Sequence, residues 1–151
     1  DVPLGVFLSG GLDSSAVVAM MAKNQVRPLK TFSVGFDVPG TEFNELDDAR
    51  IIAEHFKTEH HELILKEDDL IDVIENLVYH FDEPFADAAA FPVYFLSKFA
   101  KKHVTVALTG EGGDEIFGGY RRYAIEEKIQ RYPALKNPLL VHFSHLLRNY
   151  S

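Results

Sequence analysis

The chain has 151 residues, 46% of them hydrophobic and 25% charged, a composition typical of one soluble globular domain. Its 23 acidic and 15 basic residues give a net charge of −8, so it lacks the positive surface that nucleic-acid binding requires. It contains no cysteine, which excludes disulfides, thiolate metal sites and a cysteine nucleophile, and it shows neither a membrane-spanning apolar run nor a signal-peptide pattern, so we expect a cytoplasmic protein.

Short apolar runs rich in Val and Phe recur along the chain. Those at 2–8, 30–36 and 103–108 are nearly continuous, which predicts strands buried on both faces of a parallel sheet. The run at 58–65 alternates more and predicts a fourth strand nearer an edge.

Helical patterns separate these runs. They cover residues 13–23, 44–56, 67–81 and 92–102, and Pro92 stands where a first-turn proline belongs. The apolar faces of the second and third helices consist of Leu46, Ala49, Ala53 and Phe56, and of Leu70, Ile74, Leu77 or Val78, and Phe81. Strand and helix repeated in this way predict an α/β fold, a doubly wound, mostly parallel sheet with helices on both faces.

The pattern changes after Tyr123. The remaining residues have only helical character, interrupted by Pro133 and Pro138, and their apolar face has no evident partner. We therefore expect a core domain at 1–123 and, after it, a helical extension at 124–151 that is incomplete.

The stretch SGGLDSS joins the first strand to the first helix. Ligands of doubly wound sheets bind beyond the carboxyl ends of the strands, which is where this turn falls. Gly10 and Gly11 let the backbone approach a ligand closely, and the helix that follows directs free N–H groups at it. Three serines add hydroxyl groups: Ser9, Ser14 and Ser15. We expect the turn to hold phosphate; a plain turn with Asp13 as a helix cap is the alternative.

The acid within this turn narrows the phosphate chemistry. A P-loop carries a lysine that reaches the β and γ phosphates, whereas here the corresponding residue is Asp13. A bare carboxylate would repel phosphate, so Asp13 makes sense as a ligand of Mg2+.

A second glycine-rich loop follows the last predicted strand. In LTGEGGDEIFGGY, residues 108–120, three acids converge on glycines: Glu111, Asp114 and Glu115. Parallel strands present their carboxyl ends at one edge, so we expect Asp13 and Asp114 to share one Mg2+. An acidic surface loop with Asp114 as the cap of the next helix is the alternative.

Together the two loops resemble a known family. SGGLDSS resembles the pyrophosphate-binding loop (PP-loop) of the N-type ATP pyrophosphatases. LTGEGGDEIFGGY and the preceding HFDEPFADAAAFPVYFLSKFAKK resemble segments of asparagine synthetases. The resemblance extends to about Tyr123, and it implies an adenine nucleotide alpha hydrolase-like fold and the synthetase domain of a glutamine-hydrolysing asparagine synthetase.

The resemblance also implies roles for individual residues. Glu111 is the implied catalytic acid, acting in acyl-adenylate formation and ammonia addition, and Asp13 and Asp114 hold Mg2+. The residues implied to bind pyrophosphate are Ser9, Gly10, Gly11, Asp13, Ser14 and Ser15. Those implied to bound the adenosine of ATP are Leu8, Val34, Thr109 and Gly110.

The implied reaction is an amide synthesis driven by ATP. The side-chain carboxylate of aspartate attacks the α phosphate, pyrophosphate leaves, and ammonia then attacks the acyl carbon of β-aspartyl-AMP. The glutaminase domain that supplies ammonia in glutamine-dependent members, and the family's catalytic lysine, have no counterpart here. We therefore expect the chain to bind nucleotide and to turn over weakly or not at all. Two alternatives stay open: a β-lactam-synthetase-like enzyme that attacks with an internal amine, and a nucleotide-binding module without catalysis.

Other polar residues have less specific interpretations. His60 and His61 on an alternating strand face opposite sides, which favours a solvated edge over a metal site. A solvated helix face is favoured for Arg121 and Arg122 over contact with phosphate. Three acids around Pro84 either line the acceptor pocket or are surface charges: Asp82, Glu83 and Asp87.

Overall fold

The computed structural model describes residues 2–25, 27–37, 45–66, 69, 73–83 and 87–131. The chain divides into two compact units, Asp1–Glu111 and Gly112–Ser151. The second unit contains two described helices, α6 (Gly113–Phe117) and α7 (Arg121–Arg131). The domain boundary expected at residue 123 stays a prediction.

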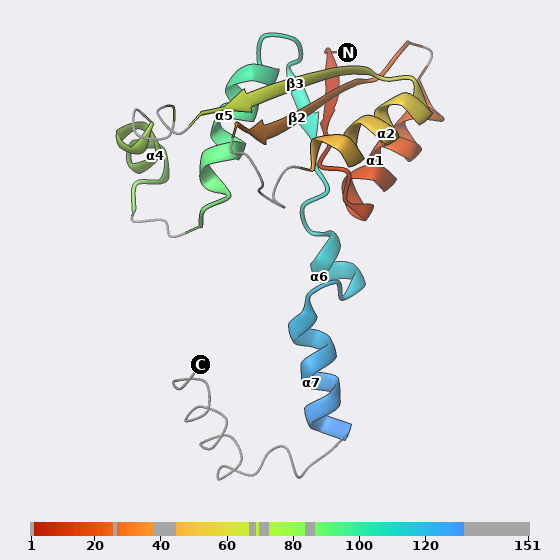
Figure 1. Cartoon of the computed structure of the whole chain (residues 1–151), viewed down its shortest axis with the longest axis vertical. Helices are drawn as coiled ribbons and strands as arrows, with labels where there is room; N and C mark the ends of the chain where they lie inside the picture. The colour runs from red at the N-terminus through yellow and green to blue at the C-terminus, as the bar shows by residue number, and fades with distance from the viewer. Residues whose placement is uncertain are drawn as a thin grey trace. The chain divides into compact units, whose positions relative to one another are not determined.

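The first unit contains the sheet (Figure 1). Its strands are β1 (Leu4–Phe7), β2 (Lys30–Phe36), β3 (Glu59–Leu65) and β4 (Val106–Leu108). Its helices are α1 (Leu12–Ala22), α2 (Leu46–Phe56), α4 (Ile74–Phe81) and α5 (Ala90–Ala100). Of the helix predicted at 67–81, residues 67, 68 and 70–72 lie outside the described residues, and Leu70 is among them.

The strand order is β3-β2-β1-β4, and all neighbouring strands are parallel. The chain runs from β1 to β2 and β3 in one direction and then returns to β4 on the other side of β1. This confirms the predicted α/β fold with a parallel sheet. The reversal of strand order at β1 marks the place where doubly wound sheets bind ligands.

Successive residues of a strand point to opposite sides of the sheet, and helices cover both faces. One face packs under α1 and α2, which lie side by side in Figure 1. This cluster contains Val6, Leu8, Val18, Leu29, Ala49 and Ala53. The other face packs against α5 through Phe32, Leu96, Ala100 and Val104. Burial of each large aliphatic side chain stabilises the fold by about 1.5–3 kcal/mol.

The predicted apolar face of α2 is confirmed, whereas that of the next helix is confirmed only in part. On α2, three residues are buried and Phe56 packs against them: Leu46, Ala49 and Ala53. On α4, Leu77 is buried, but Ile74, Val78 and Phe81 are exposed. The difference arises because α4 packs mainly against α5, whereas α2 lies on the sheet.

The prediction that the strand at 103–108 is buried on both faces is wrong. In β4, Val106 is 42% exposed and Leu108 is 40% exposed. Among the described strands β4 lies at an edge of the sheet, with β1 on one side only. An apolar run therefore identified the strand correctly but not its position.

The expectation of a solvated edge at the two histidines is also wrong. His60 and His61 do point to opposite sides of β3, but their side chains are only 13% and 22% exposed. His61 stacks on Phe32, with ring centroids 5.2 Å apart, and lies 4.4 Å from the ring centroid of His103. Both histidines are covered because helices pack on both faces of this edge strand.

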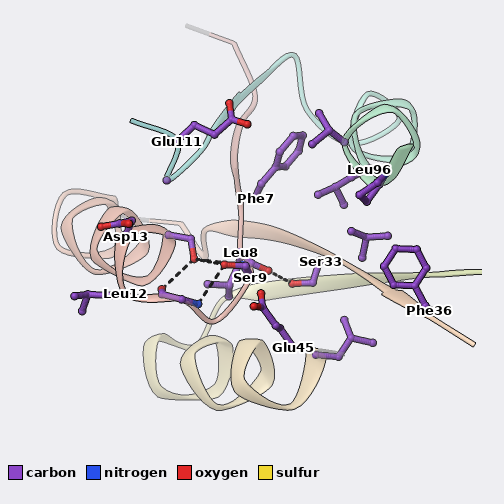
Figure 2. Close-up of a pocket in the computed structure, with 17 residues that line it drawn as sticks. Phe7, Leu8, Ser9, Leu12, Asp13, Ser33, Phe36, Glu45, Leu96 and Glu111 are labelled. Atoms are coloured by element: carbon purple, nitrogen blue, oxygen red, sulfur yellow. Dashed lines mark hydrogen bonds between the residues drawn. The ribbon is translucent and has the colours of Figure 1, made fainter. Parts of the chain in front are cut away.

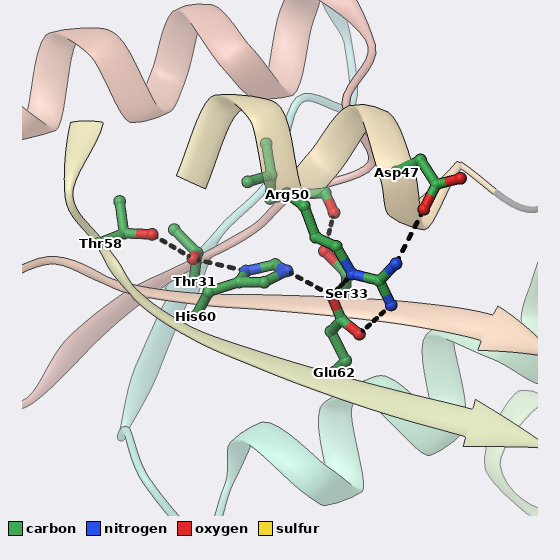
Figure 3. A network of polar contacts seen from close by, with 8 residues as sticks. Thr31, Ser33, Asp47, Arg50, Thr58, His60 and Glu62 are labelled. Carbon is green, nitrogen blue, oxygen red and sulfur yellow. Dashed lines mark hydrogen bonds and ion pairs between the residues drawn. The ribbon is translucent and has the colours of Figure 1, made fainter. Parts of the chain in front are cut away.

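On the α2 side, His60 belongs to a polar network that ties the helix to β3 (Figure 3). Its Nδ1 lies 2.9 Å from Thr31 Oγ1, and its Nε2 lies 3.3 Å from Glu62 Oε1. Arg50 donates two hydrogen bonds of 2.7 Å to the Glu62 carboxylate and one of 2.8 Å to Asp47. Burial lowers the pKa of His60, and the Arg50 guanidinium lowers the pKa of Glu62.

In the part of the chain that the structure describes, no helix has the length and hydropathy needed to cross a membrane.

Candidate functional site

A pocket of about 430 Å³ lies at the carboxyl ends of the strands, beside the point where the strand order reverses (Figure 2). Its lining comes entirely from the first unit. The lining residues are Phe7, Leu8, Ser9, Gly11, Leu12, Asp13, Ser14, Ser33, Val34, Phe36, Glu45, Leu46, Pro92, Val93, Leu96, Gly110 and Glu111.

The pocket exists because β1 is shorter than its neighbour. The pairing of β1 with β2 ends at Phe7 and Phe32, whereas β2 continues to Phe36, paired with β3 as far as Leu65. The last residues of β2 are therefore uncovered on the β1 side, and Val34 and Phe36 line the space that β1 leaves.

The turn after β1 is held by its own serines. Ser14 is buried, and its hydroxyl lies 3.0 Å from Ser9 Oγ, accepts the Ser9 N–H at 3.3 Å and lies 3.2 Å from the Gly11 carbonyl. The Gly11 N–H donates to Ser9 Oγ at 3.2 Å. The Ser14 hydroxyl thus cross-links the turn.

Gly10 allows this turn to pack against α2. Its φ of +87° is left-handed, and a Cβ at this position would lie 2.6 Å from Asp48 Cβ and 2.8 Å from the Ala49 nitrogen. Any side chain here would push the turn away from the first turn of α2.

The N-terminus of α1 opens beside the pocket. Gly11 is its N-cap and contributes no side-chain hydrogen bond, so the first N–H groups of the helix remain available for an anion. Asp13 lies in the first turn of the helix and is not its cap, which removes the cap interpretation of this residue.

The loop after β4 lies against the same helix end. A Cβ on Gly110 would stand 2.6 Å from the Ser14 nitrogen and 3.1 Å from Asp13 Cβ, so glycine alone fits at this position. The next residue, Glu111, lines the pocket. The two loops predicted to act together are thus in contact at Gly110.

The structure gathers most of the residues predicted to form the site in this unit. Those that line the pocket are Leu8, Ser9, Gly11, Asp13, Ser14, Val34, Gly110 and Glu111. Gly10 and Thr109 lie in the two loops and Ser15 lies in the first turn of α1, and none of the three lines the pocket. The Ser15 hydroxyl is buried and has no hydrogen-bond partner among the described residues, while Thr109 Oγ1 accepts the Glu111 N–H at 3.3 Å.

Several lining residues were not predicted. These are Phe7, Leu12, Ser33, Phe36, Glu45, Leu46, Pro92, Val93 and Leu96. Phe36 is the last residue of a predicted strand, so the rule that ligands bind at carboxyl ends would have found it. Phe7 and Leu12 directly flank the predicted turn, and Ser33 precedes the predicted site residue Val34, so these three also follow from local position. The other five become neighbours only when α2 and α5 pack on the sheet, for which the sequence carries no local signal.

Asp114 belongs to the second unit, so its pairing with Asp13 at one Mg2+ stays a prediction. It lies in the first turn of α6, whose N-cap is Gly112, which removes the alternative of Asp114 as the cap. Across the described ranges, no group of three or more His, Asp or Glu side chains is placed to hold a metal ion, and this includes His60 and His61.

Arg121 and Arg122, for which a solvated helix face was predicted, are both exposed at the start of α7. Arg122 nevertheless has a contact, since its guanidinium lies 4.4 Å from the centroid of the Tyr120 ring. The Tyr120 hydroxyl donates to Glu115 at 2.6 Å, which lowers the pKa of Glu115 and raises the pKa of Tyr120.

Comparison with known proteins gives consistent matches. The sequence model of the family described as asparagine synthase matches residues 1–149. The chain is 44% identical to asparagine synthetase [glutamine-hydrolyzing] 1 of Bacillus subtilis over 97% of its length, and 47% identical to putative asparagine synthetase [glutamine-hydrolyzing] 2 of Methanocaldococcus jannaschii over 80% of its length. It spans 23% of each of these relatives.

Among solved structures, the chain is similar to the NH3-dependent NAD synthetase of Campylobacter jejuni, with a TM-score of 0.48 and 13% sequence identity over 78% of this chain and 51% of that one. The family assignment depends on the sequence matches, which cover nearly all of the chain. The chain belongs to the asparagine synthase family.

Proposed function

We propose that this chain is the ATP-binding part of an amide synthetase that activates the side-chain carboxylate of aspartate and transfers ammonia to it. The observation that carries the proposal is the contact between the two loops. The Ser9–Ser15 turn, the N-terminus of α1 and Glu111 meet at one pocket, placed where a doubly wound sheet binds its ligand. The family membership gives the chemistry.

The pocket has two chemically different parts, which suit the two parts of ATP. Apolar side chains of β1, β2 and α5 offer contact area to an adenine ring, and they include Phe7, Val34 and Leu96. The turn at the N-terminus of α1 offers backbone N–H groups to phosphate. We assign the adenosine to Leu8, Val34, Thr109 and Gly110, and the pyrophosphate to the turn from Ser9 to Ser15.

The first chemical step breaks the bond between the α and β phosphates. A carboxylate oxygen of aspartate attacks the α phosphorus, the Pα–O bond to the β phosphate breaks, and pyrophosphate leaves with its negative charge. Donors fixed around the departing group stabilise this charge in the transition state. In this chain such donors are the N–H groups at the start of α1, which the Ser14 cross-link holds in place.

In the second step ammonia attacks the acyl carbon of the aspartyl adenylate, the C–O bond to AMP breaks, and a proton leaves the nitrogen. We assign acid–base or orienting work in these steps to Glu111, because it lines the pocket beside the turn. Asp13 and Asp114 are the proposed Mg2+ ligands, since carboxylates and phosphate oxygens are the ligands that Mg2+ prefers. The metal would neutralise charge on the phosphates.

The proposal names aspartate and ammonia as substrates and places the reaction in the cytoplasm, where ATP and free amino acids occur together. The relatives are named as glutamine-hydrolysing enzymes. These 151 residues contain no cysteine, so a glutaminase with a cysteine nucleophile would have to be supplied by residues outside them or by another chain. The names of the relatives favour asparagine formation over a β-lactam-synthetase-like reaction and over a binding module without catalysis.

The test is pyrophosphate release from ATP–Mg2+ with ammonium present, measured with and without aspartate. We expect release that depends on aspartate and yields AMP and asparagine in equal amounts. Glu111→Gln keeps the size of the side chain but removes its charge, and we expect it to retain ATP binding and lose asparagine formation. Two results would contradict the proposal. One is cleavage of ATP to ADP and phosphate, and the other is pyrophosphate release that does not depend on aspartate although ATP binds normally.

A further inference from the structure

Ser33 lies at the point where β1 separates from the sheet. The hydroxyl of Ser33 donates a hydrogen bond to the carbonyl of Leu8, the residue that follows β1. Both residues are buried, at 3% and 2% exposure, and both line the pocket. The Leu8 N–H still donates to the Phe32 carbonyl, at 2.8 Å, in the manner of the sheet ladder.

The Ser33 hydroxyl replaces only one of the two hydrogen bonds that would join Leu8 to β2, the one to the Leu8 carbonyl. If the parallel pairing continued, the Leu8 carbonyl would accept the N–H of Val34. Instead the pairing of β1 with β2 ends at Phe7 and Phe32, and the side chain of Ser33 satisfies the carbonyl. The backbone can therefore leave the sheet at Leu8 without exposing a buried, unpaired carbonyl, whose cost would otherwise favour other paths for the chain.

The next residue of the chain is Ser9, which begins the turn. Leu8 is thus the last residue of the chain fixed to the sheet before the turn, and Ser33 Oγ is one of its two backbone attachments. The direction in which the chain leaves at Leu8 sets the positions of the Ser9 and Gly11 N–H groups, which are held in turn by Ser14 Oγ and Ser9 Oγ.

We propose that Ser33 is a positioning residue for the nucleotide: its buried hydroxyl fixes the exit of the chain from β1 and thereby the shape of the phosphate-binding turn. The inference rests on the proposed function for its ligand, ATP, but its structural part concerns the turn itself. In this proposal Ser33 does not contact the reacting atoms; it acts through the Leu8 carbonyl, to which it donates a hydrogen bond.

Thr31 offers a matched control. It lies two residues earlier on the same strand, is also buried, and its hydroxyl bonds to Thr58 Oγ1 at 2.8 Å and His60 Nδ1 at 2.9 Å. It does not line the pocket. Thr31→Val and Ser33→Ala therefore each remove a buried hydroxyl from β2, and only the second removes the attachment of Leu8.

Two measurements on these variants test the proposal: hydrogen exchange of the Ser9 and Gly11 backbone amides, and the dissociation constant of ATP–Mg2+ by calorimetry. We expect Ser33→Ala to accelerate exchange and weaken ATP binding, each by about tenfold, because an unpaired buried carbonyl favours rearrangement of the exit. Thr31→Val should lower the melting temperature while leaving both measurements near the wild-type values. Ser33→Thr, which keeps the hydroxyl, should restore both.

The exchange measurement separates this inference from the proposed function. If the Ser9 and Gly11 amides exchange at the same rate in Ser33→Ala as in the wild type, the inference is overturned, whether or not ATP binds. Equal weakening of ATP binding in Thr31→Val and Ser33→Ala also overturns it, since the effect would then be one of stability. A third outcome is possible: the Ser9 and Gly11 amides exchange faster in Ser33→Ala but not in Thr31→Val, and the wild type binds no ATP. This would support the role of Ser33 in the turn and would count against the proposed ligand.

Discussion

The backbone of Gly110 lies so close to Ser14 that a Cβ on Gly110 would stand 2.6 Å from the Ser14 nitrogen. This contact joins the loop after β4 to the start of α1, two segments that are far apart in the sequence. The acid beside it, Glu111, is held next to the turn as a result. The packing of the two loops thus depends on the absence of one side chain.

Gly110→Ala should destabilise the fold by about 1–3 kcal/mol, because the added methyl group meets backbone atoms that cannot move aside easily. Gly11→Ala is the matched control for stability. Its Cβ would meet only the Ser9 hydroxyl, at 3.2 Å, and Gly11 has a φ of −65° that alanine adopts freely, so we expect a change within about 0.5 kcal/mol. Denaturant unfolding of the two variants checks this, and equal stability of both would show that the loops do not pack as described.

Ser14→Ala should destabilise the fold by about 1–2 kcal/mol, because the Ser9 N–H and the Gly11 carbonyl both lose a partner. The matched control is Ser97→Ala, which removes an exposed hydroxyl from α5 and should cost almost nothing. Hydrogen exchange gives a second measurement, since the Ser9 amide should exchange faster in Ser14→Ala alone. Unchanged exchange at Ser9 would mean that the Ser14 hydroxyl does not hold the turn.

The fold should lose stability as the pH falls below about 6.5. Burial lowers the pKa of both His60 and His103 below the ordinary value of 6.5, so the folded state favours their neutral forms. Their stabilising effect is therefore complete above pH 6.5 and is lost as the pH falls through the folded pKa values. Urea unfolding between pH 8 and 5 checks this. His60→Gln and His103→Gln should each flatten the slope below pH 6.5, and a wild-type stability that rises on acidification would contradict the prediction.

A second loss should occur at lower pH through Glu62. The hydrogen bonds from Arg50 lower the pKa of Glu62 below its ordinary value of 4.5, so this carboxylate stabilises the fold above pH 4.5 and stops doing so as the pH falls through its folded pKa. Glu62→Gln should flatten the dependence of stability on pH below 4.5. Because both partners reach solvent, 1 M salt should reduce the difference between Glu62→Gln and the wild type. If the difference in stability between Glu62→Gln and the wild type changes with neither pH nor salt, the ion pair is not its source.

The strands and the pocket loops could be predicted because their signals are local. A continuous apolar run identifies a strand, and glycines next to acids at the end of such a run identify a ligand loop. The burial of β4 could not be predicted, because it depends on which strands lie beside it. The same holds for His60 and His61, whose alternation was predicted correctly but whose covering helices pack from elsewhere in the chain.

The role of single residues in the site shows the same limit. Gly10 was predicted as a glycine that approaches a ligand, but its lack of a side chain also admits α2, which no local pattern indicates. Ser33 carries no local signal of its role within the strand at 30–36, because its significance comes from the residue opposite it, Leu8. Such roles arise from contacts between distant segments, so a motif can locate a site without revealing how it is supported.

The measurement that tests the central claim most directly is calorimetric titration of ATP–Mg2+ into the wild type and Asp13→Asn, with Asp37→Asn, an exposed acid just beyond β2, as the control. If the turn at the start of α1 holds the magnesium-bound phosphates of ATP, the wild type and Asp37→Asn should bind alike, and Asp13→Asn should bind at least about tenfold more weakly. Asp114→Ala should weaken binding in the same direction. Binding by Asp13→Asn that equals the wild type, or a wild type that does not bind ATP–Mg2+, would contradict the account.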